Sequence, residues 1–202
     1  MQGNELIRSY RMPQQLSDIG YNDCMNIVNY RPLSKEFVDL FTEKDNDIRY
    51  AISFNNKRLS VKNISARVRT EEMCLILAES YAHLSRTDSA LFYLNHLRSK
   101  RIANYVDYTE SGLPEVDAKS LIRVDATGKA LTKLMAAILN ERRKELFMEN
   151  DRWYELKRNG RPEFWVAGSG RKLITAKYLY TQPIPFGDMK LNPGLIQNEG
   201  YK

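Results

Sequence analysis

The stretch Asn140-Glu-Arg-Arg-Lys-Glu-Leu-Phe-Met-Glu-Asn-Asp-Arg-Trp-Tyr-Glu-Leu-Lys-Arg158 decides the fold. It continues a run in which large apolar residues recur every three or four positions: Leu131, Leu134, Met135, Ile138 and Leu139. This spacing predicts a long helix from Lys129 to about Asn150. A short helix around 152–157 follows and stops at Asn159-Gly160, so we expect a long and a short helix within residues 127–160.

The long helix carries charged residues on its apolar side. Its apolar face is continued at helical spacing by Ile138, Arg142, Leu146 and Glu149. At least one of Arg142 and Arg143 therefore points inward, and a buried guanidinium requires an anionic partner with good geometry. Glu72 and Glu79 are seven residues apart on one face of an earlier helix. We expect a structural ion-pair network of these four residues rather than a catalytic site.

A helical hairpin is predicted over residues 69–101. Thr70 begins a helix with a stripe of large residues and a stripe of small ones: Met73, Leu77, Tyr81 and Leu84, then Cys74, Ala78 and Ala82. Small residues allow a partner helix to approach closely. After a polar turn at 85–88, the second helix buries a face made by Ala90, Leu91, Leu94 and Leu97. The pair resembles a tetratricopeptide unit, which cannot bury its outer faces alone.

The remaining segments are less regular. Residues 1–31 read as an irregular N-terminal segment, and Ser34 caps a helix that ends at Asp45-Asn-Asp47. Residues 48–68 read more as strand or loop than as helix, and 104–127 as a long irregular loop. Pro183 and Pro185 exclude helix around them, which predicts an extended C-terminal strap over residues 171–202.

Length, composition and charge limit the classes of protein. The chain has 202 residues and is 43% hydrophobic, enough for one domain with a buried core. Lys and Arg number 31 against 25 Asp and Glu, a formal net charge of +6. Because the basic residues are interleaved with apolar and acidic ones, we do not expect nucleic-acid binding.

Signals of enzymatic chemistry are missing from the sequence. His83 and His96 are the histidines, and they lie on two different helices without metal-ligand spacing, so no metal site is expected. No nucleophile elbow, phosphate loop or dinucleotide fingerprint is present, so we expect neither catalysis nor a cofactor. Cys24 and Cys74 are expected to be free thiols. No apolar run is long enough to span a bilayer, and no signal region precedes Tyr10.

The order of motifs resembles the C-terminal half of the SusD/RagB family. The resemblance rests on four sequence blocks and one proline-containing motif. The blocks are Arg69-Thr-Glu-Glu-Met-Cys-Leu-Ile-Leu-Ala-Glu79, Leu94-Asn-His-Leu-Arg98, Glu141-Arg-Arg-Lys-Glu145 and Leu191-Asn-Pro-Gly-Leu-Ile-Gln-Asn-Glu-Gly-Tyr201, and the motif is Tyr180-Thr-Gln-Pro-Ile-Pro-Phe186. It implies an all-α, SusD-like fold in which a tetratricopeptide-type hairpin packs on further helices, with long irregular loops. It also implies that residues 1–202 form a single domain of the C-terminal type.

The resemblance implies a binding protein of the outer membrane of Bacteroidetes. Members capture glycans or peptides and pass them to a SusC-like TonB-dependent transporter, so that transporter and an oligosaccharide or peptide ligand are the expected partners. Membrane association would use a lipid on an N-terminal cysteine that follows a signal peptide. Neither Cys24 nor Cys74 follows such a peptide, so we expect that lipid to be absent from this chain. The alternative is a tetratricopeptide-type module that binds protein or peptide without a role in transport.

Aromatic residues in irregular segments are the candidates for ligand contact. Tyr105, Tyr108 and Trp165 lie outside the helical stripes, where their rings are placed to stack on sugar faces. Trp153 follows the long helix directly and is expected to pack at the helix junction instead. The sequence leaves open which glycan or peptide is bound.

Overall fold

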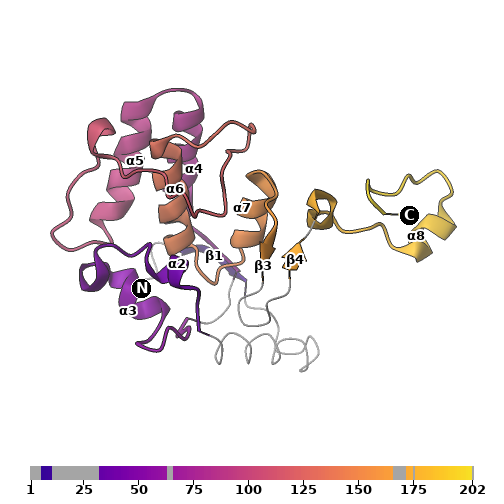
Figure 1. Cartoon of the computed structure of the whole chain (residues 1–202), viewed down its shortest axis with the longest axis horizontal. Coiled ribbons are helices and arrows are strands. Elements are labelled where there is room, and N and C mark those ends of the chain that lie inside the picture. Colours follow the sequence, from indigo (N-terminus) through magenta and orange to yellow (C-terminus); the bar gives the residue numbers. More distant parts are fainter. Residues whose placement is uncertain (1–5, 11–31, 63–65, 166–171, 175, 202) are drawn as a thin grey trace. The chain divides into compact units, whose positions relative to one another are not determined.

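The computed structural model describes residues 6–10, 32–62, 66–165, 172–174 and 176–201. The chain forms two compact units: Met1–Ala118 with Ala130–Trp153, and Lys119–Lys129 with Tyr154–Lys202. Helices dominate the described residues, as expected for an all-α, SusD-like fold (Figure 1). The single domain expected over residues 1–202 stays a prediction, and the two units are described separately below.

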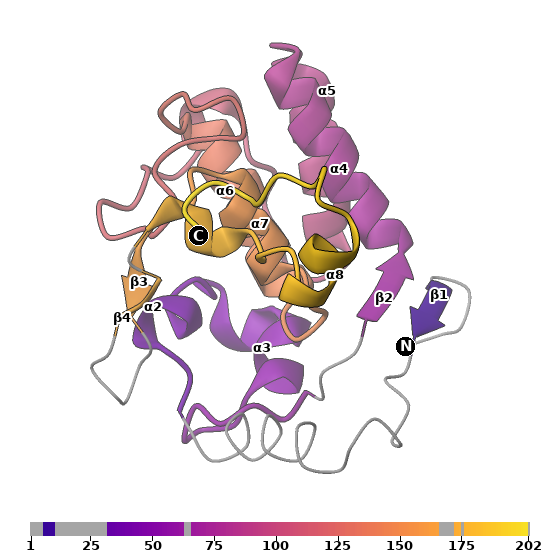
Figure 2. The ribbon, with the colours of Figure 1, turned by 90° about the vertical axis from the view of Figure 1, so that its right-hand side faces the viewer.

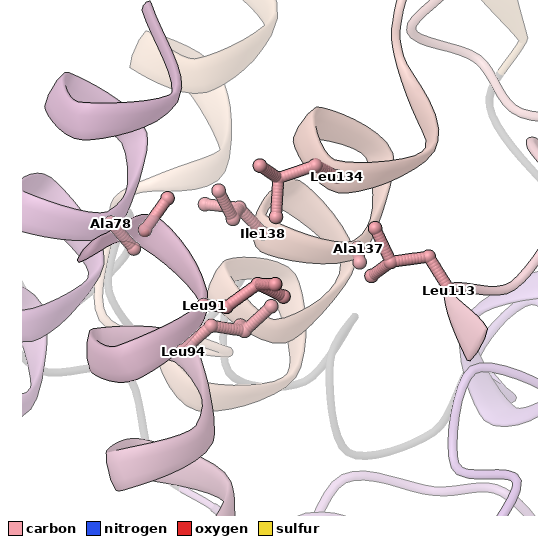
Figure 3. Close-up of a cluster of buried hydrophobic side chains, with 8 residues drawn as sticks. Ala78, Leu91, Leu94, Leu113, Leu134, Ala137 and Ile138 are labelled. Carbon is pink, nitrogen blue, oxygen red and sulfur yellow. The ribbon is translucent and has the colours of Figure 1, made fainter. Parts of the chain in front are cut away.

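The first unit is built around three helices. The hairpin of α4 (Thr70–His83) and α5 (Thr87–Ser99) packs against α6 (Lys133–Glu145), as the sequence predicts. Between them lies a core of buried side chains that includes Ala78, Leu91, Leu94, Leu134 and Ile138 (Figure 3). Because Ala78 and Ala90 are small and fully buried, the helices can approach closely.

Three of the four large residues in the α4 stripe point away from the core, whereas Tyr81 packs against it. Leu75 and Ala78 are buried, whereas Met73, Leu77 and Leu84 are 39%, 37% and 68% exposed. The small-residue stripe therefore faces the partner helices, because it permits the closest helix packing. The outward stripe leaves an exposed apolar face on the described part of this hairpin.

The N-terminal part of the unit contains a helix that the sequence analysis assigned to strand or loop. α3 (Ile48–Ser53) begins at Asp47, whose side chain accepts a hydrogen bond from the Arg49 amide at 3.0 Å. Before it comes the short α2 (Lys35–Val38), capped by Ser34 as expected. The expected end at Asp45-Asn-Asp47 was wrong, because Lys44–Asn46 is a separate 3-10 helix. Among the described residues of the 48–68 segment, the strand is at the end: β2 (Ala66–Arg69) pairs antiparallel with β1 (Leu6–Tyr10) and leads into α4 (Figure 2).

Aromatic rings pack beside these short elements. Phe37, Phe41 and Phe54 are buried together, and their rings meet edge to face at centroid separations of 5.4 to 6.2 Å. Edge-to-face packing brings the positive ring edge against a negative ring face, which stabilises the cluster. This aromatic cluster gives the 32–62 segment its own core.

The long helix is shorter than predicted at both ends. α6 begins at Lys133 rather than Lys129, because Thr132 is the N-cap and accepts from the Met135 amide at 3.1 Å. It ends at Glu145, and Met148 and Asn150 have positive φ angles of 63° and 66°. The expected extension to Asn150 was therefore wrong. The chain turns there instead, and Glu149 reaches cations outside the helix.

The second unit contains most of α7 (Arg152–Arg158), the strand pair β3 (Phe164–Trp165) and β4 (Lys172–Ile174), and the C-terminal segment. α7 agrees with the predicted short helix. It ends at Arg158, two residues before Gly160, whose φ of +85° favours glycine and where an added Cβ would lie 2.5 Å from Val124 Cγ2.

The strap is not wholly extended. It contains a short 3-10 helix (Lys177–Tyr180) and α8 (Phe186–Leu191), so the exclusion of helix around the prolines was wrong at this point. Pro185 is the N-cap of α8, a position where the missing proline amide costs nothing. The Gln197 side chain bonds both backbone groups of Ile184, at 2.7 and 2.9 Å, and this ties the segment together.

Candidate functional site

The loop after α5 carries two of the three rings expected to contact ligand. It follows the end of α5 at Ser99 and turns back along that helix (Figure 1). At its far end Leu113 is buried in the same core as Leu94 and Ile138. The loop is therefore anchored at both ends although it has little regular structure.

Tyr108 is fixed by two neighbours on α5. Its amide donates to Asn95 Oδ1 and its carbonyl accepts from Asn95 Nδ2, both at 2.9 Å. The guanidinium carbon of Arg98 lies 3.7 Å from the centre of the Tyr108 ring. Burial raises the pKa of the Tyr108 hydroxyl. One ring face is thus occupied by Arg98, which leaves at most the other for a ligand.

Tyr105 is more open. Its ring is half-buried, and its hydroxyl donates to Asp107 Oδ1 at 2.5 Å. The neighbouring Val106 is 77% exposed. A half-exposed ring beside an exposed carboxylate can offer an apolar face and a hydrogen-bond acceptor to the same ligand.

Trp165 is not in a loop as expected. It belongs to β3, where it pairs with Lys172 of β4, while Phe164 pairs with Ile174. The loop assignment was wrong because Pro162 and Gly168 bracket two residues that take extended backbone and find a partner strand. The Trp165 side chain lies outside the described residues, so its contact with ligand stays a prediction.

The strongest electrostatic feature of the first unit is centred on Glu141 of α6. This carboxylate is 2% exposed and accepts from Arg49 Nη2 at 2.8 Å, Arg98 Nη1 at 2.8 Å and Lys144 Nζ at 2.6 Å. Burial alone would raise its pKa, but these three cations outweigh burial and lower the pKa to about 2. Glu141 is therefore ionised at neutral pH.

Glu145 is a second centre one helical turn further on. It pairs with Arg69 at 2.8 Å, Arg101 at 3.1 Å and Arg49 at 3.3 Å. Burial would raise its pKa too, but Arg101, Arg49 and Arg69 lower it to about 2. A third carboxylate, Glu149, bonds Arg69 at 3.0 Å and Lys62 at 2.6 Å.

We call this set the α6 ion cluster. Its members lie on or beside α3, β2, α5 and α6: Asp47, Arg49, Lys62, Arg69, Arg98, Arg101, Glu141, Lys144, Glu145 and Glu149. Each central carboxylate is buried and already accepts from several cations. Because these cations come from separate segments of the chain, the cluster joins the elements structurally.

The residues expected in the ion-pair network are only partly brought together. Arg142 Nη2 lies 3.4 Å from Glu72 Oε1 and 2.6 Å from Asp151 Oδ1, which is its closer partner. Glu79 is buried and lies 3.9 Å from His83 Nε2. The Arg143 guanidinium carbon lies 5.4 Å from the centre of the Phe37 ring.

Sequence reasoning missed the α6 ion cluster although one signal for it was present. Glu141 and Glu145 continue the stripe of Leu134 and Ile138 at positions i+7 and i+11. Carboxylates on a buried stripe require cations, just as a buried arginine requires anions. Which arginines supply them depends on segments 43 to 96 residues away in sequence, such as Arg49, so spacing alone could not identify them.

Two cations of α6, Arg142 and Lys133, differ in burial, which predicts different effects of alanine. Arg142→Ala should lower the free energy of unfolding by about 2–3 kcal/mol, because Asp151 and Glu72 lose a buried charged donor. Lys133→Ala breaks an exposed pair with Glu115, whose side chain is 82% exposed, and should cost about 1 kcal/mol or less. Urea unfolding followed by circular dichroism at 222 nm would measure both. Equal effects would contradict the geometry.

Neither a metal centre nor a membrane span emerges from the described residues. Within the described ranges, no group of three or more His, Cys, Asp and Glu side chains could hold a metal ion. No helix of the described part is both long enough and apolar enough to cross a bilayer. Cys74 is a free thiol on α4, and Cys24 lies outside the described residues.

Comparison with known families decides the class of protein. Residues 29–201 match the family model described as the SusD family. The chain belongs to the SusD family. The resemblance read from the Arg69, Glu141 and Leu191 blocks is thereby confirmed. A search of curated proteins finds no match.

Solved structures share the fold of this SusD family chain. A SusD superfamily protein from Bacteroides vulgatus ATCC 8482 is 19% identical with a TM-score of 0.60, and the match covers 87% of this chain and 42% of that one. A second protein of that strain, described as a proposed sugar-binding protein, is 23% identical with a TM-score of 0.55, and the match covers 88% and 42%. The chain thus spans less than half the length of these two solved proteins.

Proposed function

We propose that this SusD family chain is part of a nutrient-binding component of the outer membrane, with an oligosaccharide as ligand and a SusC-like TonB-dependent transporter as partner. The observation that carries the proposal is the family match over residues 29–201. The chain binds and does not catalyse. Its membrane association would use an N-terminal lipid attached to a longer polypeptide.

Two observations support an oligosaccharide as the ligand. One solved protein that shares the fold is described as a proposed sugar-binding protein. In this chain, Tyr105 places a half-exposed ring beside the Asp107 carboxylate. A sugar offers an apolar face to a ring and hydroxyl donors to a carboxylate, so this pair suits a pyranose better than an anionic ligand.

We expect oligosaccharide binding that depends on Tyr105. Calorimetry with glucose, xylose and mannose hexasaccharides of both anomeric linkages would test it, with His83→Ala as a control. Binding by this chain alone should be weak, because a partial site has few contacts to offset the cost of association. Tyr105→Ala should weaken it by about tenfold, the equivalent of about 1.4 kcal/mol. No response to any hexasaccharide, from this chain or from a longer polypeptide containing it, would contradict the proposal.

The transporter and the outer membrane need a separate experiment. A tagged longer polypeptide containing this chain should fractionate with outer membranes and co-purify with a TonB-dependent transporter encoded beside it. Fractionation with the cytoplasm would overturn the localisation, and purification without a transporter would overturn the partnership.

A second candidate function is a tetratricopeptide-type module that binds protein or peptide. It is favoured by the exposed apolar stripe of α4, where Met73, Leu77 and Leu84 are not covered by the described elements. Such a module should respond to peptides and not to sugars. The hexasaccharide panel and a peptide panel, measured with the same protein, would separate the two functions.

A further inference from the structure

The side chain of Asn95 makes an unusual pair of contacts for a residue in the middle of a helix. It lies on α5, and its carboxamide bonds both backbone groups of Tyr108, which is thirteen residues further along the chain. Both distances are 2.9 Å. A carboxamide has one acceptor and donors in one plane, so it can replace a neighbouring strand for a single residue. Asn95 therefore satisfies the amide and the carbonyl of Tyr108, as a neighbouring strand would in a sheet.

Arg98 strengthens the same anchor from one turn further along α5. Its guanidinium covers a face of the Tyr108 ring, and the guanidinium itself is fixed by Glu141 at 2.8 Å and Glu43 at 3.0 Å. Arg98 is 3% exposed, so it can move little. The conformation of the loop at Tyr108 is thereby set by α5 and by the α6 ion cluster.

The part of the loop before this anchor is open to solvent. Asn104 takes a left-handed backbone with φ of 53°, Val106 is 77% exposed, and Asp107 is exposed. The Tyr105–Asp107 pair thus lies in an open stretch between the end of α5 and the fixed Tyr108. The backbone of this stretch is bonded to other segments at Ala103, whose amide donates to the Asn46 carbonyl at 2.7 Å, and at Tyr108.

We propose that Asn95 is a positioning residue that fixes the loop 103–113 and so determines how Tyr105 and Asp107 are presented to a ligand. The presentation part of this proposal rests on the proposed function. A loop held in its binding conformation avoids an ordering cost when ligand binds. Asn95 itself need not touch the ligand, because its carboxamide is used by Tyr108.

Limited proteolysis tests the anchor without any ligand. Chymotrypsin cleaves after tyrosine, so cleavage after Tyr105 or Tyr108, identified by mass spectrometry, reports opening of the loop. Asn95→Ala removes both hydrogen bonds and should raise the cleavage rate at least about tenfold. His96→Ala is the matched control: it is the next residue of α5, it is exposed, and its ring faces Phe92.

An isosteric variant separates anchoring from simple space filling. Asn95→Asp keeps the shape and the acceptor for the Tyr108 amide but places a carboxylate oxygen against the Tyr108 carbonyl. It should open the loop nearly as much as Asn95→Ala at pH 7, while helical circular dichroism stays at the wild-type level. Cleavage at the wild-type rate in both variants would overturn the proposal.

A binding experiment tests the link to ligand. For whichever hexasaccharide binds the wild type, Asn95→Ala should raise Kd about tenfold and His96→Ala should not. An unchanged Kd in a variant with an opened loop would overturn the presentation part. If no hexasaccharide binds the wild type, the proposed function fails and the presentation part falls with it, whereas proteolysis still decides whether Asn95 anchors the loop.

Discussion

Replacement of Glu141 by glutamine should lower the free energy of unfolding by about 3–5 kcal/mol, because Arg49, Arg98 and Lys144 would be left as buried cations without their shared anion. The carboxylate is 2% exposed and lies within 2.8 Å of all three cationic groups. A glutamine has nearly the same shape, so the loss would report charge rather than a cavity. Urea unfolding of the full chain would measure it.

The chain offers a matched control for this substitution. Glu115 pairs with Lys133, but its side chain is 82% exposed, so Glu115→Gln should change the free energy of unfolding by less than about 1 kcal/mol. Similar effects at the two positions would show that the cations of the α6 ion cluster do not depend on Glu141. A loss at Glu141 alone would confirm that burial makes this charge indispensable.

Acid should destabilise the protein between about pH 5 and pH 2. Glu141 and Glu145 have pKa values of about 2 in the folded chain, against an ordinary value of 4.5. Since the folded values are depressed, the stabilisation is fully present above pH 4.5 and is lost as the pH falls toward 2. Each carboxylate contributes on the order of 3 kcal/mol by this linkage.

Thermal unfolding at a series of pH values would test this prediction. The Tm of the wild type should fall steeply below about pH 5, and the Tm of Glu141→Gln should fall less steeply because one titrating carboxylate is gone. An equal pH dependence in the two proteins would contradict the assignment. A flat profile from pH 5 to pH 3 would show that neither carboxylate has a depressed pKa.

The helices that define the family were predictable from the sequence. The hairpin α4–α5, the central helix α6 and the short α7 all follow from apolar residues at helical spacing. Motif order alone identified the SusD family, since the Arg69, Glu141 and Leu191 blocks occur within the matched residues 29–201. Local spacing and motif order are properties of the chain itself, so they can be read without coordinates.

Tertiary structure decided which side of each helix is buried. The stripe of Met73 and Leu77 has the same period as the stripe of Ala78, and only packing against α5 and α6 selects the small one. α3 was unpredictable for a similar reason, because its Arg49 is directed to Glu141 and Glu145 on a helix more than ninety residues away.

The candidate site was likewise predictable from the sequence in part. The sequence placed Tyr105 and Tyr108 in an irregular loop, and the structure describes them there. Only the fold shows that Arg98 covers the Tyr108 ring and that Asn95 bonds the backbone of Tyr108. Periodicity is local and is encoded in neighbouring residues, whereas the partner of a buried charge or a loop amide is chosen by contacts between distant segments, which spacing along the chain does not record.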